Sequence, residues 1–165
     1  MKRKYVAFRV GEEQFGIGLE EVAKIIRLEN VTDVPAAPSF VEGVLNLGGD
    51  VVPVVNLRGR FSLPRLAPSR WSRVIVVERE QRRFGVLVDG VREILELDDD
   101  NILTEAVSAP AVKSEFVLGI AKIRDDLLVL LDIFRVLSAP PEVSLRPELP
   151  VRPEADLRPI GNRGA

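Results

Sequence analysis

The acidic pairs and the glycine pair of this chain are the residues whose types and spacing could support catalysis or ligand binding. Glu12-Glu13 and Glu20-Glu21 are paired carboxylates, but they lie in polar stretches typical of solvated turns. Asp98-Asp99-Asp100 lacks the spaced oxygen ligands and the distal glutamate of a calcium loop, which favours an ordinary acidic turn. Gly48-Gly49 is not followed by the Gly-Lys-Ser/Thr ending of a phosphate loop. None of these clusters predicts a catalytic or metal site.

The composition removes most of the remaining catalytic chemistry. The 165 residues include no histidine and no cysteine, which excludes thiol nucleophiles, imidazole or thiolate metal ligands and the usual general base near neutral pH. The formal net charge is −2, which indicates no general attraction to nucleic acid or anionic lipid. We therefore expect a protein that is not an enzyme and that uses no cofactor and no metal.

One basic stretch, Arg58–Arg73, allows two interpretations. It holds five arginines, no acid and the sole tryptophan, Trp71, so it resembles a surface for nucleic acid or for an acidic partner. Pro64 and Pro68 instead mark it as a connecting loop, and no nucleic-acid motif accompanies it. We favour a connector in which Trp71 packs at a module boundary, and keep a nucleic-acid-binding small β-barrel as the alternative function.

The elements that must position these residues occur twice in the chain. Residues 15–25, FGIGLEEVAKI, match residues 84–94, FGVLVDGVREI, with an offset of 69. Residues 41–61 match residues 117–137 with an offset of 76. A duplicated unit of about seventy residues predicts two similar modules, and each is small enough that the two should share an interface.

Short apolar runs separated by turn residues predict β-hairpins within each copy. The predicted strand pairs are 5–10 with 14–17, 41–47 with 51–57, 73–77 with 84–88, and 116–123 with 127–131. Pro53 indicates a strand edge or a bulge.

The segment Leu19–Leu28 and the two polar residues Asn56 and Asp132 give further local predictions. Leu19–Leu28 fits either a helix face or a strand face, and Gly90 at the position of Glu21 in the second copy disfavours a long helix. We predict a short turn at Leu19–Glu21 and a strand from Val22. Asn56 and Asp132 are each placed to cap one turn of helix after the last strand of a copy.

The predicted fold class is therefore all-β, with two tandem five-stranded barrels and short helical turns. We place one domain at 1–138, with a first barrel at about 11–63, a second barrel at about 71–138, and the strand at 4–10 as a candidate for sharing between them. Residues 139–165 hold six of the twelve prolines and balanced charges. They predict a disordered proline-rich tail, with a short peptide motif as the alternative.

The segment VPAAPSFVEGVLNLGGDVVPVVNLRGRF at 34–61 resembles the central signature of the CheW family of bacterial chemotaxis coupling proteins. FGI at 15–17, FGVLVDGVREIL at 84–95 and FVLGIAKIRDDLLVLLDIFRVL at 116–137 also resemble that family, in family order. The resemblance covers about Lys4 to Leu137.

The resemblance implies two SH3-like barrels and a signalling adaptor. Such proteins bridge the cytoplasmic tips of methyl-accepting chemoreceptors to the regulatory domain of a CheA-type histidine kinase. It implies a cytoplasmic location at membrane-associated chemoreceptor arrays, without direct insertion into the membrane and without nucleic acid as a partner. No apolar run approaches the roughly 18 residues of a spanning helix, which agrees with this expectation.

The resemblance also supplies candidate receptor-binding residues, at which this chain departs from the family pattern. Val22 matches an aliphatic position, Lys24 stands where the family often has glutamate, and Gly48 stands where the Asn-Leu-Arg-Gly turn has arginine. These departures indicate either surface drift or a divergent protein for a non-standard chemosensory pathway.

Three further candidates are less specific. Asn46 and Asp50 are also explained as turn residues, and Arg58 either contacts a partner or covers the end of a barrel with its stem. The kinase-binding surface is expected on the second barrel, at residues that the sequence does not identify.

Overall fold

The computed structural model describes residues 1–37, 40–104, 112 and 114–138, and the predicted tail at 139–165 lies outside the described residues. The strands are β1 (Lys2–Val10), β2 (Glu13–Gly18), β3 (Val22–Arg27), β4 (Val41–Leu47), β5 (Asp50–Asn56), β6 (Arg73–Arg79), β7 (Arg82–Val88), β8 (Gly90–Asp98), β9 (Ile102–Leu103), β10 (Val117–Ile123) and β11 (Asp126–Leu131). The helices are η1 (Leu19–Glu21), α1 (Leu57–Arg60), η2 (Asp99–Asn101), η3 (Ser114–Phe116) and α2 (Ile133–Ser138).

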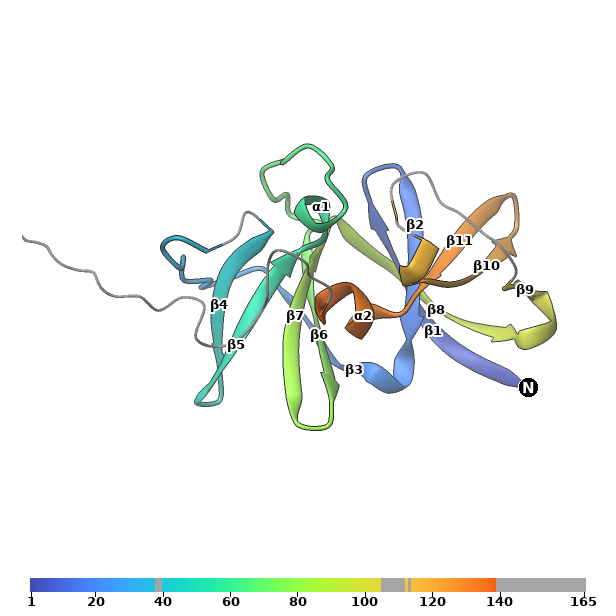
Figure 1. The fold of residues 1–165 in the computed structure, drawn as a ribbon, viewed down its shortest axis with the longest axis horizontal. Helices are drawn as coiled ribbons and strands as arrows, with labels where there is room; N and C mark the ends of the chain where they lie inside the picture. Colours follow the sequence, from blue (N-terminus) through green and yellow to red (C-terminus); the bar gives the residue numbers. More distant parts are fainter. Residues whose placement is uncertain (38–39, 105–111, 113, 139–165) are drawn as a thin grey trace, which may run out of the picture.

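The strands form two sheets that lie side by side (Figure 1). One has the order β3-β6-β7-β5-β4 and the other has the order β8-β1-β2-β11-β10-β9. In the first sheet, Thr32 follows β3 and bridges back to Val44 of β4, so that the sheet curls on itself. In the second, β9 follows β8 through η2 and pairs with β10 at the opposite edge. We refer to them as the five-stranded barrel and the six-stranded barrel, and they confirm the all-β, SH3-like fold class.

The division of the chain between the barrels differs from the predicted boundaries of 11–63 and 71–138. Residues 22–88 supply every strand of the five-stranded barrel, whereas β1 and β2 join strands from residues 90–131 in the six-stranded barrel. Each copy of the repeat therefore places its first hairpin in the barrel completed by the other copy. The registers correspond, because Ile25 pairs with Ile75 while Ile94, 69 residues after Ile25, pairs with Val6. The strand at 4–10 belongs to the six-stranded barrel and has both of its partners there.

Three apolar cores hold this arrangement together. Leu45, Val54, Val74, Val76 and Leu87 fill the five-stranded barrel. A second core, of Tyr5, Ala7, Leu97, Ala121, Leu128 and Leu130, fills the six-stranded barrel. The largest core contains side chains of both barrels, including Phe8, Phe15, Ile75, Val86 and Leu131. Central strands such as β6 are buried on both faces, which explains their nearly continuous apolar sequence. The predicted shared interface is confirmed.

Most local predictions are also confirmed. The turn at Leu19–Glu21 is η1, and β3 begins at Val22. The Asn56 side chain accepts a hydrogen bond from the Arg58 amide at 2.9 Å, and Asp132 accepts one from the Arg135 amide at 3.2 Å, so both cap a helix. Pro53 lies just before the residues Val54–Asn56 that pair with β7. Pro53 therefore lies where β5 has no hydrogen-bonded partner on its β7 side, so no amide donor is needed there.

Candidate functional site

The β3 edge carries two of the candidate receptor-binding residues. Val22 is half-buried and packs against the large core shared by the barrels, whereas the Lys24 side chain is exposed. β3 pairs along one side with β6, and a register shift between Val22 and Lys24 interrupts the ladder. Ile25, the next residue, is 38% exposed. An apolar strand edge with a charged side chain beside it suits contact with another polypeptide.

The turn between β4 and β5 carries three more candidates. Gly48 and Gly49 have φ of 59° and 95°, as a two-residue hairpin turn of this kind requires. The Asn46 side chain accepts a hydrogen bond from the Gly49 amide at 3.0 Å, which confirms its role in the turn. Asp50 is exposed and lies 3.5 Å from the Arg83 guanidinium. No atom lies within 4 Å of a Cβ placed on Gly48, so any side chain there would project into solvent.

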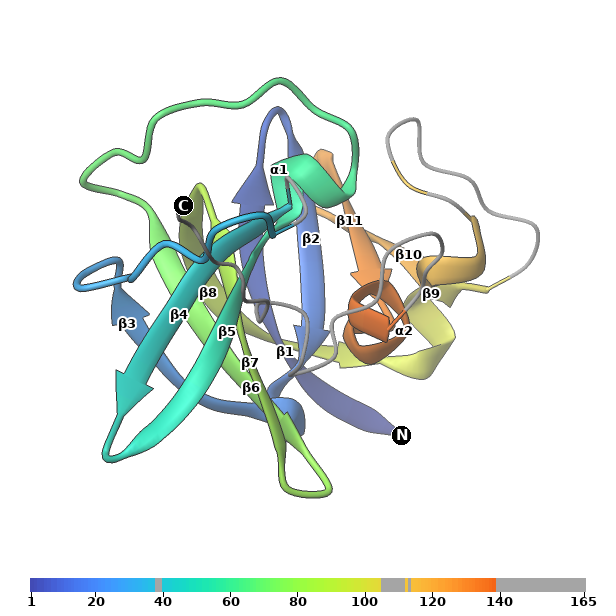
Figure 2. The same ribbon diagram turned by 60° about the vertical axis from the view of Figure 1, so that its left-hand side comes forward.

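The β4–β5 and β6–β7 hairpins project from the same end of the five-stranded barrel (Figure 2). A depression lies between residues of these two hairpins. Its volume is about 380 Å³, and its lining includes Asp50, Val51, Glu78 and Arg83. Val51 is 68% exposed. An exposed apolar side chain with a charged rim is the usual composition of a protein contact surface.

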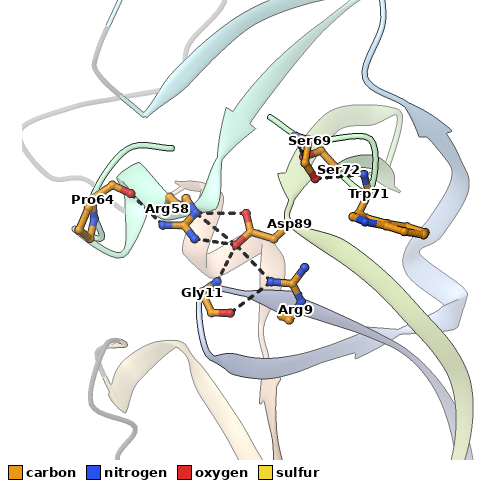
Figure 3. Close-up of polar contacts among 8 residues, drawn as sticks. All are labelled: Arg9, Gly11, Arg58, Pro64, Ser69, Trp71, Ser72 and Asp89. Carbon is orange, nitrogen blue, oxygen red and sulfur yellow. Dashed lines mark hydrogen bonds and ion pairs between the residues drawn. The ribbon is translucent and has the colours of Figure 1, made fainter. Parts of the chain in front are cut away.

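Arg58 lies at the other end of β5 and is engaged within the chain (Figure 3). Its Nε lies 3.2 Å from each carboxylate oxygen of Asp89, its Nη2 donates to Asp89 at 2.9 Å, and its Nη1 donates to the Pro64 carbonyl at 2.9 Å. Asp89 also accepts from the Gly11 amide at 2.7 Å. The cluster thus joins α1 of the five-stranded barrel to the β1–β2 turn of the six-stranded barrel. Only 12% of the Arg58 side chain is exposed, so its structural role leaves little of it for a partner.

The pKa of Asp89 lies below its ordinary value. Burial raises this pKa, but the hydrogen bonds from Arg58 and Gly11 and the charges of Arg58 and Arg9 together outweigh the burial. Because the folded state holds the pKa below its unfolded value, the carboxylate stabilises the fold at neutral pH. That contribution is lost as the pH falls through the lowered pKa.

Asp89→Asn is expected to lower the free energy of unfolding by about 1–3 kcal/mol at neutral pH, because Arg58 loses its ionised partner. As the pH falls below the ordinary aspartate pKa of about 3.9, Asp89 is protonated first in the unfolded chain and then, at its lowered pKa, in the folded chain, so the difference between the two proteins should shrink. Urea denaturation at several pH values measures this difference, with Asp125→Asn in an exposed turn as the control. A difference that is constant from pH 7 to pH 3 would contradict the assignment.

The structure groups the six candidates into three places. Val22 and Lys24 share β3, and Asn46, Gly48 and Asp50 share the β4–β5 turn. β3 and β4 are at opposite ends of the sheet order, and Arg58 belongs with neither group.

Sequence reasoning missed the exposed apolar residues and misplaced Trp71. Ile25 and Ile94 are related by the offset of 69, and Ile94 is 57% exposed. Val51 and Leu127 are related by the offset of 76, and they are 68% and 58% exposed. Leu103 and Leu118 are also exposed, at 70% and 54%. The repeat alignment pairs the first four residues, but their exposure depends on the packing of the strands. Trp71 is 58% exposed, so the prediction that it packs at a boundary is wrong.

A comparison with protein-family models matches residues 4–140 to the CheW-like domain. The chain belongs to the CheW family. Chemotaxis protein CheW of Klebsiella aerogenes is 31% identical over 137 residues, which cover 83% of this chain and 82% of that protein. Protein FrzA of Myxococcus xanthus is 27% identical over 121 residues, or 73% of this chain and 75% of that protein.

A solved CheW structure agrees with the observed fold. The scaffolding protein TtCheW from Thermoanaerobacter tengcongensis superposes with a TM-score of 0.76 at 30% identity, covering 84% of this chain and 90% of that one. Within the described residues, no helix is long and apolar enough to cross a membrane. The family of chemotaxis and scaffolding proteins is thereby established for this chain.

Proposed function

We propose that this CheW-family chain is a non-enzymatic adaptor that couples the cytoplasmic tips of chemoreceptors to a CheA-type histidine kinase, in the cytoplasm at membrane-associated receptor arrays. The observation that carries the proposal is two pairs of repeat-related exposed apolar residues, Ile25 with Ile94 and Val51 with Leu127. One molecule thus presents exposed apolar side chains on both barrels, as a bridge between two other proteins requires. The chemotaxis and scaffolding relatives support the same conclusion.

We assign the receptor to the five-stranded barrel. Val22 and Lys24 on β3 form one contact, and the β4–β5 turn with Asn46, Gly48 and Asp50 forms a second. Arg58 acts indirectly, because its contacts with Asp89 and Pro64 hold α1 and the connector in place.

We assign the kinase regulatory domain to the six-stranded barrel. Leu103 on β9 and Leu118 on β10 are exposed on adjacent strands, and Leu127 is exposed near the β10–β11 turn.

The proposal is tested by calorimetry with a purified receptor tip and with a kinase regulatory domain. Leu118→Glu is expected to weaken kinase binding by about tenfold or more while leaving receptor binding unchanged. The control is Glu12→Lys, an exposed position in the β1–β2 turn of the same barrel. Failure of the natural chain to bind either protein would contradict the adaptor function.

Nucleic-acid binding is the competing outcome, and a salt titration with random oligonucleotides distinguishes it. The five arginines in Arg58–Arg73 all contact this chain already: Arg58 binds Asp89, Arg60 donates to the Val136 carbonyl at 3.0 Å, Arg65 lies 3.5 Å from Glu42, Arg70 lies over the Trp71 ring, and Arg73 donates to backbone carbonyls. Micromolar binding that falls steeply with salt would favour nucleic acid.

The departures at Lys24 and Gly48 make a further prediction about the receptor. If they mark a divergent partner, Gly48→Arg with Lys24→Glu is expected to bind a receptor tip of the usual family type about tenfold more tightly, or by about 1.4 kcal/mol. The control is Gly48→Gln with Lys24→Gln, because both variants carry the same strain at the positive φ of Gly48. Unchanged affinity in the Arg/Glu variant would indicate surface drift instead.

A further inference from the structure

Two arginines lie directly opposite each other on neighbouring strands of the five-stranded barrel. Arg27 at the end of β3 is the register partner of Arg73 at the start of β6. Directly opposed side chains lie on the same face of a sheet, and like charges in that position destabilise the pair. The repeat supplies an internal comparison, because the equivalent pair in the six-stranded barrel is Glu96 opposite Lys4. One barrel therefore compensates its charges at this position and the other does not.

The cationic surface extends from this pair into the connector. The Arg73 Nη1 donates at 2.8 Å to the backbone carbonyls of Arg70 and Ser72. The Arg70 guanidinium lies over the Trp71 ring, 4.8 Å from its centroid. Arg27, Arg70 and Trp71 are all exposed. Arg27, Arg73, Arg70 and Trp71 thus form one continuous surface, which we call the arginine–tryptophan patch.

The acids near this patch do not neutralise it. Asp89, which precedes Gly90 beside Trp71, is held by Arg58 and by the Gly11 amide (Figure 3). Glu29 follows Arg27 by two residues and forms no ion pair with it. Among the residues that the structure describes, Arg27, Arg70 and Arg73 have no carboxylate within ion-pair distance.

We propose that the arginine–tryptophan patch binds an acidic segment of a partner protein. Guanidinium groups pair with carboxylates in a planar, two-bond geometry, and an acidic partner would relieve the repulsion between Arg27 and Arg73. Nucleic acid fits less well, because Arg70 already covers the Trp71 ring on which a base would stack. The inference does not depend on the adaptor function, since it follows from charges and contacts on one face.

The test is a titration of the full chain at low salt with a short peptide of glutamates separated by glycines. Calorimetry and fluorescence measure the binding. Trp71 is the sole tryptophan, so its emission reports on the patch alone. We expect saturable binding that changes the Trp71 emission.

Arg27→Glu is the decisive variant, because it recreates the opposite-charge pair of the other barrel. It is expected to weaken peptide binding about tenfold and also to raise the Tm by a few degrees. Arg27→Gln should weaken binding less, and Lys122→Glu, with the same change of charge on the other barrel, should leave binding and Tm unchanged. Absent binding, binding that Arg27→Glu does not weaken, or tighter and steeply salt-dependent binding of a dT oligonucleotide would each overturn the proposal.

Discussion

Gly43→Ala is expected to lower the free energy of unfolding by about 3–5 kcal/mol, because it combines backbone strain with a backbone collision. Gly43 has a φ of 153°, which side-chain-bearing residues rarely adopt. A Cβ at this position would lie 2.3 Å from the Thr32 carbonyl oxygen. Thr32 and Val44 exchange two backbone hydrogen bonds of 2.9 Å at this point, and these bonds close the five-stranded barrel. The substitution therefore disrupts the hydrogen bonds that close the barrel.

Urea denaturation followed by circular dichroism measures the loss. At the equivalent glycine in the other barrel, Gly119, an alanine should also destabilise the fold but by less, because its Cβ would lie 2.8 Å from the Leu103 carbonyl oxygen without the strain of a positive φ. Gly48→Asn is the matched control, since Gly48 is surrounded by open space and asparagine tolerates its positive φ. A Gly43→Ala protein as stable as the Gly48→Asn protein would show that the barrel is not closed in this way.

Cutting the chain between Leu66 and Ala67 is expected to give two fragments that do not fold separately but assemble when mixed. The first fragment keeps β1 and β2 but lacks β8, β10 and β11, with which they form a barrel. The second fragment keeps β6 and β7 but lacks β3, β4 and β5. Each fragment alone would also expose its half of the large shared core, at a cost of about 25 cal/mol for each Å² of apolar surface.

Size-exclusion chromatography and near-ultraviolet circular dichroism follow the assembly. The mixture should elute as a one-to-one complex with the spectrum of the uncut chain, because the cut lies in an exposed connector and removes no strand. If either half of the Leu66–Ala67 cut forms a stable folded monomer, the exchange of hairpins is not required for folding.

Local structure could be read from the sequence because it depends on neighbouring residues. Gly48 and Gly49 supply the positive φ angles of a tight turn, and Asn56 and Asp132 supply oxygens for the first amides of a helix. That β1 is buried on both faces was not predicted: Tyr5 and Ala7 belong to one core, and Val6 and Phe8 belong to another.

The surfaces were harder to predict, since exposure depends on what the rest of the chain covers. Trp71 is a large aromatic residue, a type often found in cores, but its side chain is exposed. Arg58 is a residue type common in protein contacts, but it forms an ion pair with Asp89. Ile25 and Ile94 read as ordinary strand residues until the sheets show that β3 and β8 each have one unpaired edge.

The sequence by itself determined that there are two copies, where the hairpins and the helix caps lie, and that the copies share a core. Only the tertiary structure decided which hairpin completes which barrel and which side chains remain in solvent. The physical reason lies in the duplication, because Phe15 and Phe84 occupy equivalent positions in hairpins with equivalent apolar faces. Either hairpin suits either barrel locally, so the choice depends on packing between residues far apart in the chain.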